Sequence, residues 1–161
     1  MNDLHHISVR VNGALYEGSV ESRLLLSDFL RETLRMTGTH VGCEHGVCGA
    51  CTIMIDGHSI RACLMFAVQA DGLSLQTVEG LGKVSDLHPL QESFREHHAL
   101  QCGFCTPGML MTGVDFLEKH PDATDDEIRE GLSGNLCRCT GYQHIVAAVR
   151  NAAAKKKEAS R

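Results

Sequence analysis

The sequence predicts an α+β protein, with the strands in its N-terminal half and only helices in its C-terminal half. Apolar and polar residues alternate in several short segments before about residue 80, and no later segment shows this alternation. Eight cysteines form two groups of four, one group in each half. A module of about 75 residues buries little apolar surface, so a metal bound by each group would help its half to fold. We therefore expect two domains, residues 1–80 and residues 81–161.

The N-terminal domain is expected to begin with a β-hairpin. Residues 6–11 alternate between apolar and polar types, and residues 14–20 follow as a second strand. Between them, Asn12-Gly13 supplies the two positive-φ residues that a type I′ turn requires. The apolar residues that share the inward face of the first strand are Ile7, Val9 and Val11.

A helix, a glycine-rich loop and further strands are expected to complete this domain. Leucine and phenylalanine side chains recur at helical spacing over residues 24–36, which indicates a helix packed on a core. The glycine-rich loop covers residues 42–51, and a strand at 51–55 precedes the two-residue turn Asp56-Gly57. A last strand is expected at 73–78. Together these elements resemble the β-grasp fold of plant-type ferredoxins.

The C-terminal domain is expected to be an all-α bundle of four helices. They cover residues 88–100, 106–119 and 125–132, and a last segment that begins at Thr140 or Gly141. Thr106 is a candidate N-cap with Pro107 at the first helical position. Thr124 and Glu127 have the spacing of a capping box.

The first group of cysteines has the spacing of a plant-type [2Fe–2S] site. Its members, in the pattern C-x4-C-x2-C-x11-C, are Cys43, Cys48, Cys51 and Cys63. Gly42, Gly46 and Gly49 lie among the first three, where glycine lets the backbone adopt positive φ and pass close to a cluster. Pairing across the second turn places Cys63 opposite Ala50 and next to Cys51. A zinc site would more often show C-x2-C pairs.

The second group is less specific by itself. Its members, in the pattern C-x2-C-x31-C-x-C, are Cys102, Cys105, Cys137 and Cys139. Two such pairs could bind zinc. An iron–sulfur cluster is favoured because both pairs precede expected helix N-termini, which attract an anionic group, and because the chain also has a ferredoxin-like group.

Composition excludes several other functions. The net charge of −5 and the 4% aromatic content, without tryptophan, argue against nucleic-acid binding. No residue pattern indicates a nucleophile, a dinucleotide or a phosphate site, and no window is apolar enough for a membrane span. No signal peptide is visible, so we expect a cytoplasmic chain whose cysteines bind metal rather than form four disulfides. Export of the folded protein with a partner subunit stays open.

Three segments carry a resemblance to a known family. They are GCEHGVCGACTIMIDG at residues 42–57, QCGFCTPGML at 101–110 and GNLCRCTGY at 134–142. In this order they are similar to the small iron–sulfur subunit of the bacterial molybdenum hydroxylases, the xanthine dehydrogenase and aldehyde oxidase family. The similarity extends over residues 6–153, with no departure at a ligand position. Within the family, the sequence most resembles small subunits of carbon monoxide dehydrogenase and of N-heterocycle or aldehyde hydroxylases.

The resemblance implies an electron-transfer subunit that is not catalytic by itself. It implies two [2Fe–2S] clusters here, a molybdenum–pterin cofactor on a large partner subunit and FAD on a medium partner subunit, in a dimer of heterotrimers. The complex would hydroxylate an aldehyde, an N-heterocycle or a similar small substrate, or oxidise carbon monoxide. The second group of cysteines would hold the cluster nearer molybdenum and the first group the cluster nearer FAD. Gln101 and Cys139 would contact the pterin.

Two other interpretations are consistent with parts of the pattern. The chain could be a free-standing ferredoxin-like carrier with two clusters, or a zinc-stapled adaptor without a redox role. Metal analysis separates the adaptor from the other two, and the presence of partner subunits separates the carrier from the enzyme subunit.

Overall fold

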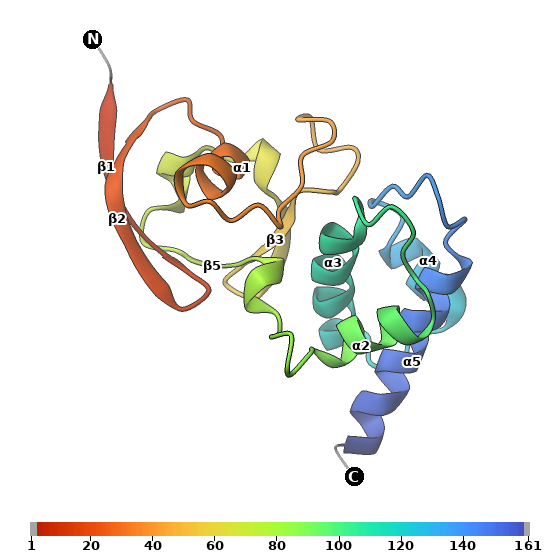
Figure 1. The fold of residues 1–161 in the computed structure, drawn as a ribbon. Helices are drawn as coiled ribbons and strands as arrows, with labels where there is room; N and C mark the ends of the chain where they lie inside the picture. The colour runs from red at the N-terminus through yellow and green to blue at the C-terminus, as the bar shows by residue number, and fades with distance from the viewer. Residues whose placement is uncertain (1–2, 160–161) are drawn as a thin grey trace.

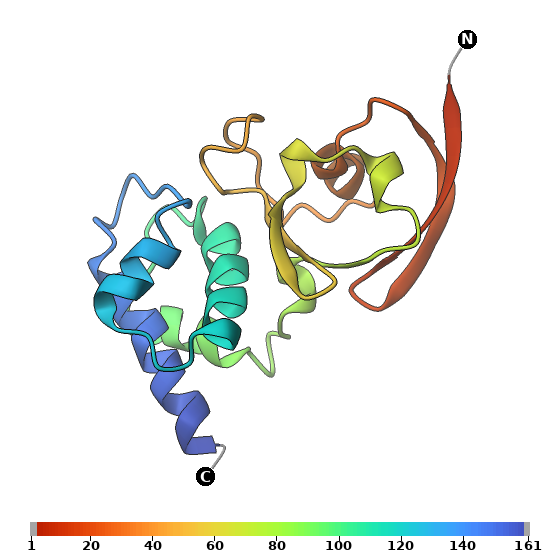
Figure 2. The same cartoon turned by 180° about the vertical axis from the view of Figure 1, so that it is seen from behind.

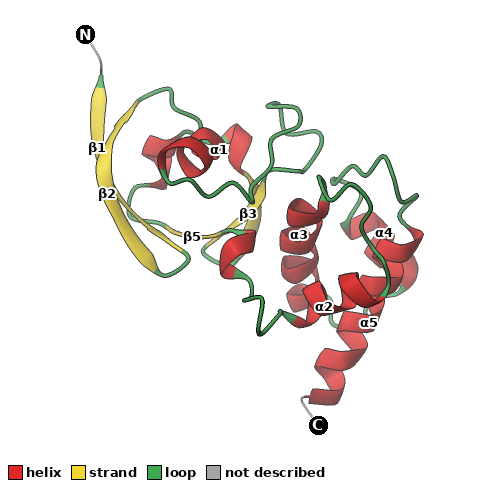
Figure 3. Ribbon diagram, viewed as in Figure 1, coloured by secondary structure: helices red, strands yellow, loops and turns green. Residues whose placement is uncertain are grey.

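Strands and helices occupy separate halves of the molecule, and the computed structural model describes residues 3–159. The outermost residues of the two expected domains, 1–2 and 160–161, lie outside the described residues. The strands are β1 (Leu4–Val11), β2 (Ala14–Glu21), β3 (Thr52–Ile55), β4 (His58–Arg61) and β5 (Ser74–Gln76). The helices are α1 (Leu26–Asp28), α2 (Pro89–Glu96), α3 (Thr106–Lys119), α4 (Asp125–Gly131) and α5 (Gln143–Ala159). Figure 1, and Figure 3 by secondary structure, show the strands and α1 on one side and α2 to α5 on the other. This arrangement confirms the predicted α+β class.

The five strands form one mixed sheet in the order β2-β1-β5-β3-β4. β1 and β5 are parallel, and the other neighbouring strands are antiparallel. Asn12 and Gly13 have φ values of 51° and 85°, which confirms the predicted turn between β1 and β2. Asp56 and Gly57, with φ values of 47° and 85°, form the same kind of turn between β3 and β4.

The helix beside the sheet is shorter than the predicted segment 24–36. α1 continues as a π-helical segment, Phe29–Thr33, whose buried side chains still face the sheet core. The chain leaves the helix because Arg35 adopts a left-handed φ of 59°, and the Met36 N–H donates to the Leu30 carbonyl at 2.9 Å. Apolar periodicity therefore identified the buried face but not the helix length.

Two of the four predicted C-terminal helices have clearly different ends, and a third has the predicted bounds but a different N-cap. α2 ends early because the backbone becomes left-handed at His98, with φ of 50°. The N-cap of α3 is Cys105 and not Thr106. α5 begins later than predicted because Gly141 and Tyr142 both adopt positive φ. The predicted capping box of α4 is present.

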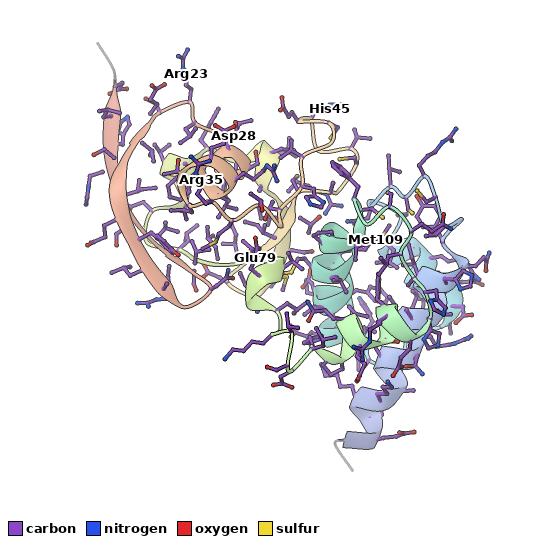
Figure 4. All side chains as sticks on the ribbon, in the orientation of Figure 1. Arg23, Asp28, Arg35, His45, Glu79 and Met109 are labelled. Carbon is purple, nitrogen blue, oxygen red and sulfur yellow. The ribbon has the colours of Figure 1, made fainter. Side chains whose placement is uncertain are left out.

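Each half has its own hydrophobic core. Buried residues of the sheet core include Ile7, Val9, Val11, Leu26, Leu30, Cys51, Ile53, Cys63 and Leu75. Buried residues of the helical core include Leu90, Phe94, Met109, Val114, Ile128, Ile145 and Val149. Figure 4 labels Met109, which lies on α3 and is fully buried. Because each half has its own core, each half can hold its group of cysteines in place.

The two halves contact each other through α3, which packs against β3 and β4. The carboxylate of Asp115 on α3, only 7% exposed, accepts hydrogen bonds from the Ser59 N–H at 3.1 Å and the Ser59 hydroxyl at 2.6 Å. Lys119 forms an ion pair with the other carboxylate oxygen at 2.6 Å. Burial raises the pKa of Asp115, but the hydrogen bonds from Lys119 and Ser59 outweigh it and hold the pKa below its usual value of 3.8. The carboxylate is therefore ionised at neutral pH.

Replacement of this carboxylate is expected to weaken the junction of the halves. Asp115→Asn should lower stability by about 1–2 kcal/mol at neutral pH, because it removes the ion pair and weakens the bonds to Ser59. Thermal unfolding followed by circular dichroism measures the change. Asp126→Asn is the control, since Asp126 is 94% exposed in its ion pair with Arg129 and should matter little. Equal effects of the two substitutions would contradict a role for Asp115 at the junction.

Candidate metal centres

The first group of cysteines lies where the glycine-rich loop meets the hairpin of β3 and β4. The Ala62 N–H donates to the Cys51 carbonyl at 3.2 Å, so the pairing of these strands continues past their ends. Cys63 therefore lies beside Cys51, close enough for the two thiols to interact. These two residues are 3% and 2% exposed. Cys43 and Cys48 are half-buried, and the Cys48 N–H donates to the Cys43 sulfur at 3.4 Å.

The backbone of the glycine-rich loop folds closely around its cysteines. Gly46 and Gly49 have φ values of 81° and 73°, as expected for glycines that let the chain turn back. Gly42 has a different role, because a Cβ at this residue would lie 3.2 Å from the Cys48 sulfur. Figure 4 shows His45 at the outer end of the loop, away from the sheet. The loop thus leaves room for its thiolates.

The second group lies at the end of the helical half that is nearest to the glycine-rich loop. Cys105 is the N-cap of α3, whose dipole favours an anionic group. Cys105 and Cys137 are half-buried against the helical core, close enough for their thiols to interact. Cys102 and Cys139 are exposed, with their sulfur atoms 3.5 Å apart. The C-x-C pair does not directly precede a helix as predicted, since α5 begins only at Gln143.

Several donors surround the Cys137 sulfur. The Thr140 hydroxyl oxygen lies 3.1 Å from it, while the Cys137 N–H donates to the Tyr142 hydroxyl at 2.8 Å. Burial raises the pKa of Cys137, but hydrogen bonds from the Thr140 hydroxyl and from the N–H groups of Thr140 and Cys139 outweigh it. The net result is a lowered pKa. These donors favour a thiolate at this residue.

The thiols differ in how readily they lose their protons. Hydrogen bonds from the N–H groups of Cys48 and His45 lower the pKa of Cys43 to about 6. Burial raises the pKa of Cys51 to about 11 and that of Cys105 to about 12. Because the thiolate is the metal ligand, a metal that binds Cys51 or Cys105 at neutral pH must displace a proton.

Hydrogen bonds join the two cysteine loops directly. The Leu136 N–H donates to the Cys48 carbonyl at 2.8 Å, and the Asn135 side-chain amide donates to the Gly49 carbonyl at 3.0 Å. Asn135 is 1% exposed, and its amide oxygen accepts from the Thr112 hydroxyl at 2.9 Å. Figures 1 and 2 both show the orange loop of the sheet half beside the N-terminal end of α3. The two candidate centres therefore belong to one continuous structure.

The residues present fit two [2Fe–2S] clusters. The inner pairs of thiols are Cys51 with Cys63 and Cys105 with Cys137, and the outer pairs are Cys43 with Cys48 and Cys102 with Cys139. Two pairs suit a cluster in which each of two irons takes two thiolates. The Thr106 hydroxyl beside Cys105 is buried without a protein partner, and a sulfur acceptor there would satisfy it. Among the described residues, no three His, Cys, Asp or Glu side chains form a group that could hold a single metal ion.

Two family models match the chain and together cover both groups of cysteines. A 2Fe-2S iron-sulfur cluster binding domain matches residues 30–96, and a [2Fe-2S] binding domain matches residues 77–150. Caffeine dehydrogenase subunit gamma of Pseudomonas sp. (strain CBB1) is 60% identical over 151 residues, which cover 91% of this chain and 90% of that protein. The nicotine 6-hydroxylase small subunit of Paenarthrobacter nicotinovorans is 54% identical, over 94% of this chain and 91% of that protein.

The chain belongs to the small iron–sulfur subunits of the molybdenum hydroxylase family. Solved structures agree with this assignment. A chain of quinoline 2-oxidoreductase from Pseudomonas putida 86 superposes with a TM-score of 0.91 at 52% identity, over 96% of this chain and 97% of that one. Aldehyde oxidoreductase from Desulfovibrio gigas also gives a TM-score of 0.91, at 40% identity, and this chain spans 17% of its length.

Membership confirms the predicted class of function. The chain is an iron–sulfur, electron-transferring subunit of an oxidoreductase and contains two [2Fe–2S] binding domains. Gln101 lies exposed beside the outer pair of the second group. Asn135, Thr140 and Tyr142 were not predicted from the sequence as residues of the site, and only the motif GNLCRCTGY, which contains all three, could have drawn attention to them.

Proposed function

We propose that this chain relays electrons, one at a time, from a molybdenum–pterin site on a large partner subunit to FAD on a medium partner subunit. The observation that carries the proposal is the hydrogen bond from the Leu136 N–H to the Cys48 carbonyl, at 2.8 Å. Leu136 precedes Cys137, a proposed ligand of the second group, and Cys48 is a proposed ligand of the first group, so this bond links the two groups. Two redox centres held in this way can pass electrons without a movement of the halves.

Each group of cysteines would bind one [2Fe–2S] cluster. We name the cluster of Cys43, Cys48, Cys51 and Cys63 the sheet cluster, and that of Cys102, Cys105, Cys137 and Cys139 the helical cluster. When bound, the clusters supply reversible one-electron chemistry. The inner pairs would shield one side of each cluster from water, and the outer pairs would face the partners.

The proposed order of transfer is the one that the family resemblance implies, and the exposed thiols of the second group support it. Gln101, Cys102 and Cys139 are exposed together, so we propose that they face the large subunit, with Gln101 and Cys139 at its pterin. Electrons would then pass through the helical cluster to the sheet cluster and on to FAD. A dimer of heterotrimers is the proposed assembly.

We propose a β-grasp domain over residues 1–80 and a helical domain over residues 81–161. The strand order β2-β1-β5-β3-β4 with a helical segment on one face supports the first, and the separate helical core supports the second. The cytoplasm is the proposed compartment, supported by eight cysteines that form no disulfide. No helix within residues 3–159 is long and apolar enough to cross a membrane.

An N-heterocycle is the proposed substrate class of the complex. The relatives named for caffeine, nicotine and quinoline are between 52% and 60% identical to this chain, whereas the aldehyde oxidoreductase from Desulfovibrio gigas is 40% identical. The substrate site itself would lie on the large subunit.

Expression with neighbouring genes for a large and a medium subunit tests the function. We expect the three chains to purify together, with about four iron and four sulfide per copy of this chain. Oxidation of an N-heterocycle should reduce both clusters before an external acceptor is added. A chain that purifies alone, with full iron content, would instead indicate a free-standing carrier, and stoichiometric zinc would indicate a structural adaptor.

A further inference from the structure

We propose that the Thr140 hydroxyl raises the reduction potential of the helical cluster by donating a hydrogen bond to the Cys137 sulfur. The two atoms are 3.1 Å apart, within the limit for a hydrogen bond to sulfur. The inference rests on the proposed function, because it requires that Cys137 binds iron. Thr140 is not itself a ligand and would act only through this sulfur.

The neighbouring contacts determine the direction of the hydrogen bond. The Tyr142 N–H donates to the Thr140 hydroxyl oxygen at 3.1 Å, which occupies a lone pair of this oxygen. The O–H proton of Thr140 is then available for another acceptor. Since an iron-bound Cys137 sulfur has no proton, it can only accept.

The segment 137–142 holds the hydroxyl in place through a closed set of contacts. The Tyr142 hydroxyl accepts from the Cys137 N–H at 2.8 Å, and the tyrosine side chain packs against the helical core. Tyr142 also has a left-handed φ of 67°, which is unfavourable for a residue with a side chain. The Tyr142 N–H, the Tyr142 hydroxyl and the Thr140 hydroxyl thus contact one another's neighbours within six residues, and these contacts hold the hydroxyl beside the Cys137 sulfur without a bound metal.

A donor to a thiolate ligand favours the reduced state. Reduction adds one electron to the centre without transfer of a proton, so negative charge on the sulfur atoms increases. A hydrogen bond to the sulfur becomes stronger as this charge grows, and hydrogen bonds to sulfur are one of the factors that set cluster potentials. Such a bond at the helical cluster would help it to take electrons from the large subunit.

Removal of the hydroxyl tests the inference in the assembled complex. In Thr140→Val, the equilibrium constant for one-electron reduction of the helical cluster should fall about threefold to tenfold, and a tenfold fall corresponds to 59 mV. Potentiometric titration followed by electron paramagnetic resonance measures the potential of each cluster separately. Thr140→Ser should restore the potential, because serine keeps the hydroxyl. The sheet cluster of the same sample is the internal control and should not change.

The possible outcomes separate this inference from the proposed function. An unchanged helical-cluster potential in Thr140→Val, or an equal fall in Thr140→Ser, would overturn the role of Thr140 while both clusters remain. Thr140→Ala provides the same measurement if the valine variant fails to assemble. A wild-type protein without a second cluster signal would overturn the proposed function instead.

Discussion

A Cys51→Ala chain is expected to bind about two irons instead of about four, and to lose the sheet cluster alone. Cys51 is 2% exposed and belongs to the sheet core, so no other cysteine can replace it without unpacking that core. The helical cluster should persist because its thiols lie on a half with a separate core. Iron analysis and electron paramagnetic resonance of the reduced protein measure both effects. Electron flow to FAD should stop, although molybdenum can still reduce the helical cluster.

The reciprocal variant, Cys105→Ala, is the matched control. Cys105 belongs to the inner pair of the other group, and its loss should abolish the helical cluster while the sheet cluster keeps its signal. The two variants together assign each signal to one half. Loss of both signals in either variant would show that the two clusters do not assemble independently, and retention of all iron in Cys51→Ala would show that Cys51 is not a ligand.

Strand pairing was predicted most accurately where a short turn fixes which residues of the two strands lie opposite each other. Asn12-Gly13 and Asp56-Gly57 specify tight turns, and a two-residue turn leaves only one register for the strands on either side. The second turn is the reason that Cys63 could be placed beside Cys51 before the structure was known. Each of these predictions rests on a turn made by two residues that are adjacent in the chain.

Helix ends were predicted less well, for a physical reason. The apolar periodicity of residues 24–36 is satisfied by any helical turn that directs Leu26, Phe29 and Leu30 to the core, including the π-helical one observed. At α5, the left-handed φ of Tyr142 postpones the start of the helix. A tyrosine rarely adopts this conformation, so nothing in its residue type indicated it.

The junction between the cysteine loops was not predictable from local patterns. Asn135 contacts Gly49, a residue far away in the chain, and a single polar residue has no periodicity from which its burial could be inferred. The close approach of Gly108 to Gly49 is of the same kind. These contacts depend on how the two halves pack against each other. A small substitution at one of them should therefore have a large effect on stability.

Gly108→Ala is expected to lower the thermal midpoint by about 2–8 °C and to disturb the sheet cluster. A Cβ on Gly108 would lie 2.2 Å from the Gly49 carbonyl oxygen and 3.1 Å from the Cα of Ala50. Both neighbours are backbone atoms of the loop between Cys48 and Cys51, so α3 or this loop must move. Overpacking of this kind costs about 1–3 kcal/mol or more, which exceeds the roughly 1 kcal/mol that alanine gains over glycine in a helix.

Gly113→Ala, on the same helix, separates this clash from a general effect of alanine. Its Cβ would lie 2.9 Å from a terminal methyl group of the Leu90 side chain and 3.9 Å from Val149, so it would meet side-chain atoms and no backbone atom. We therefore expect little change in thermal midpoint and unchanged cluster signals for Gly113→Ala, measured by circular dichroism and electron paramagnetic resonance. If Gly108→Ala behaved in the same way, the direct contact between α3 and the cysteine loop would not be needed to hold the two centres together. If it reduced stability and altered only the sheet-cluster signal, the close packing of α3 on the loop between Cys48 and Cys51 would be needed to keep the sheet cluster in place.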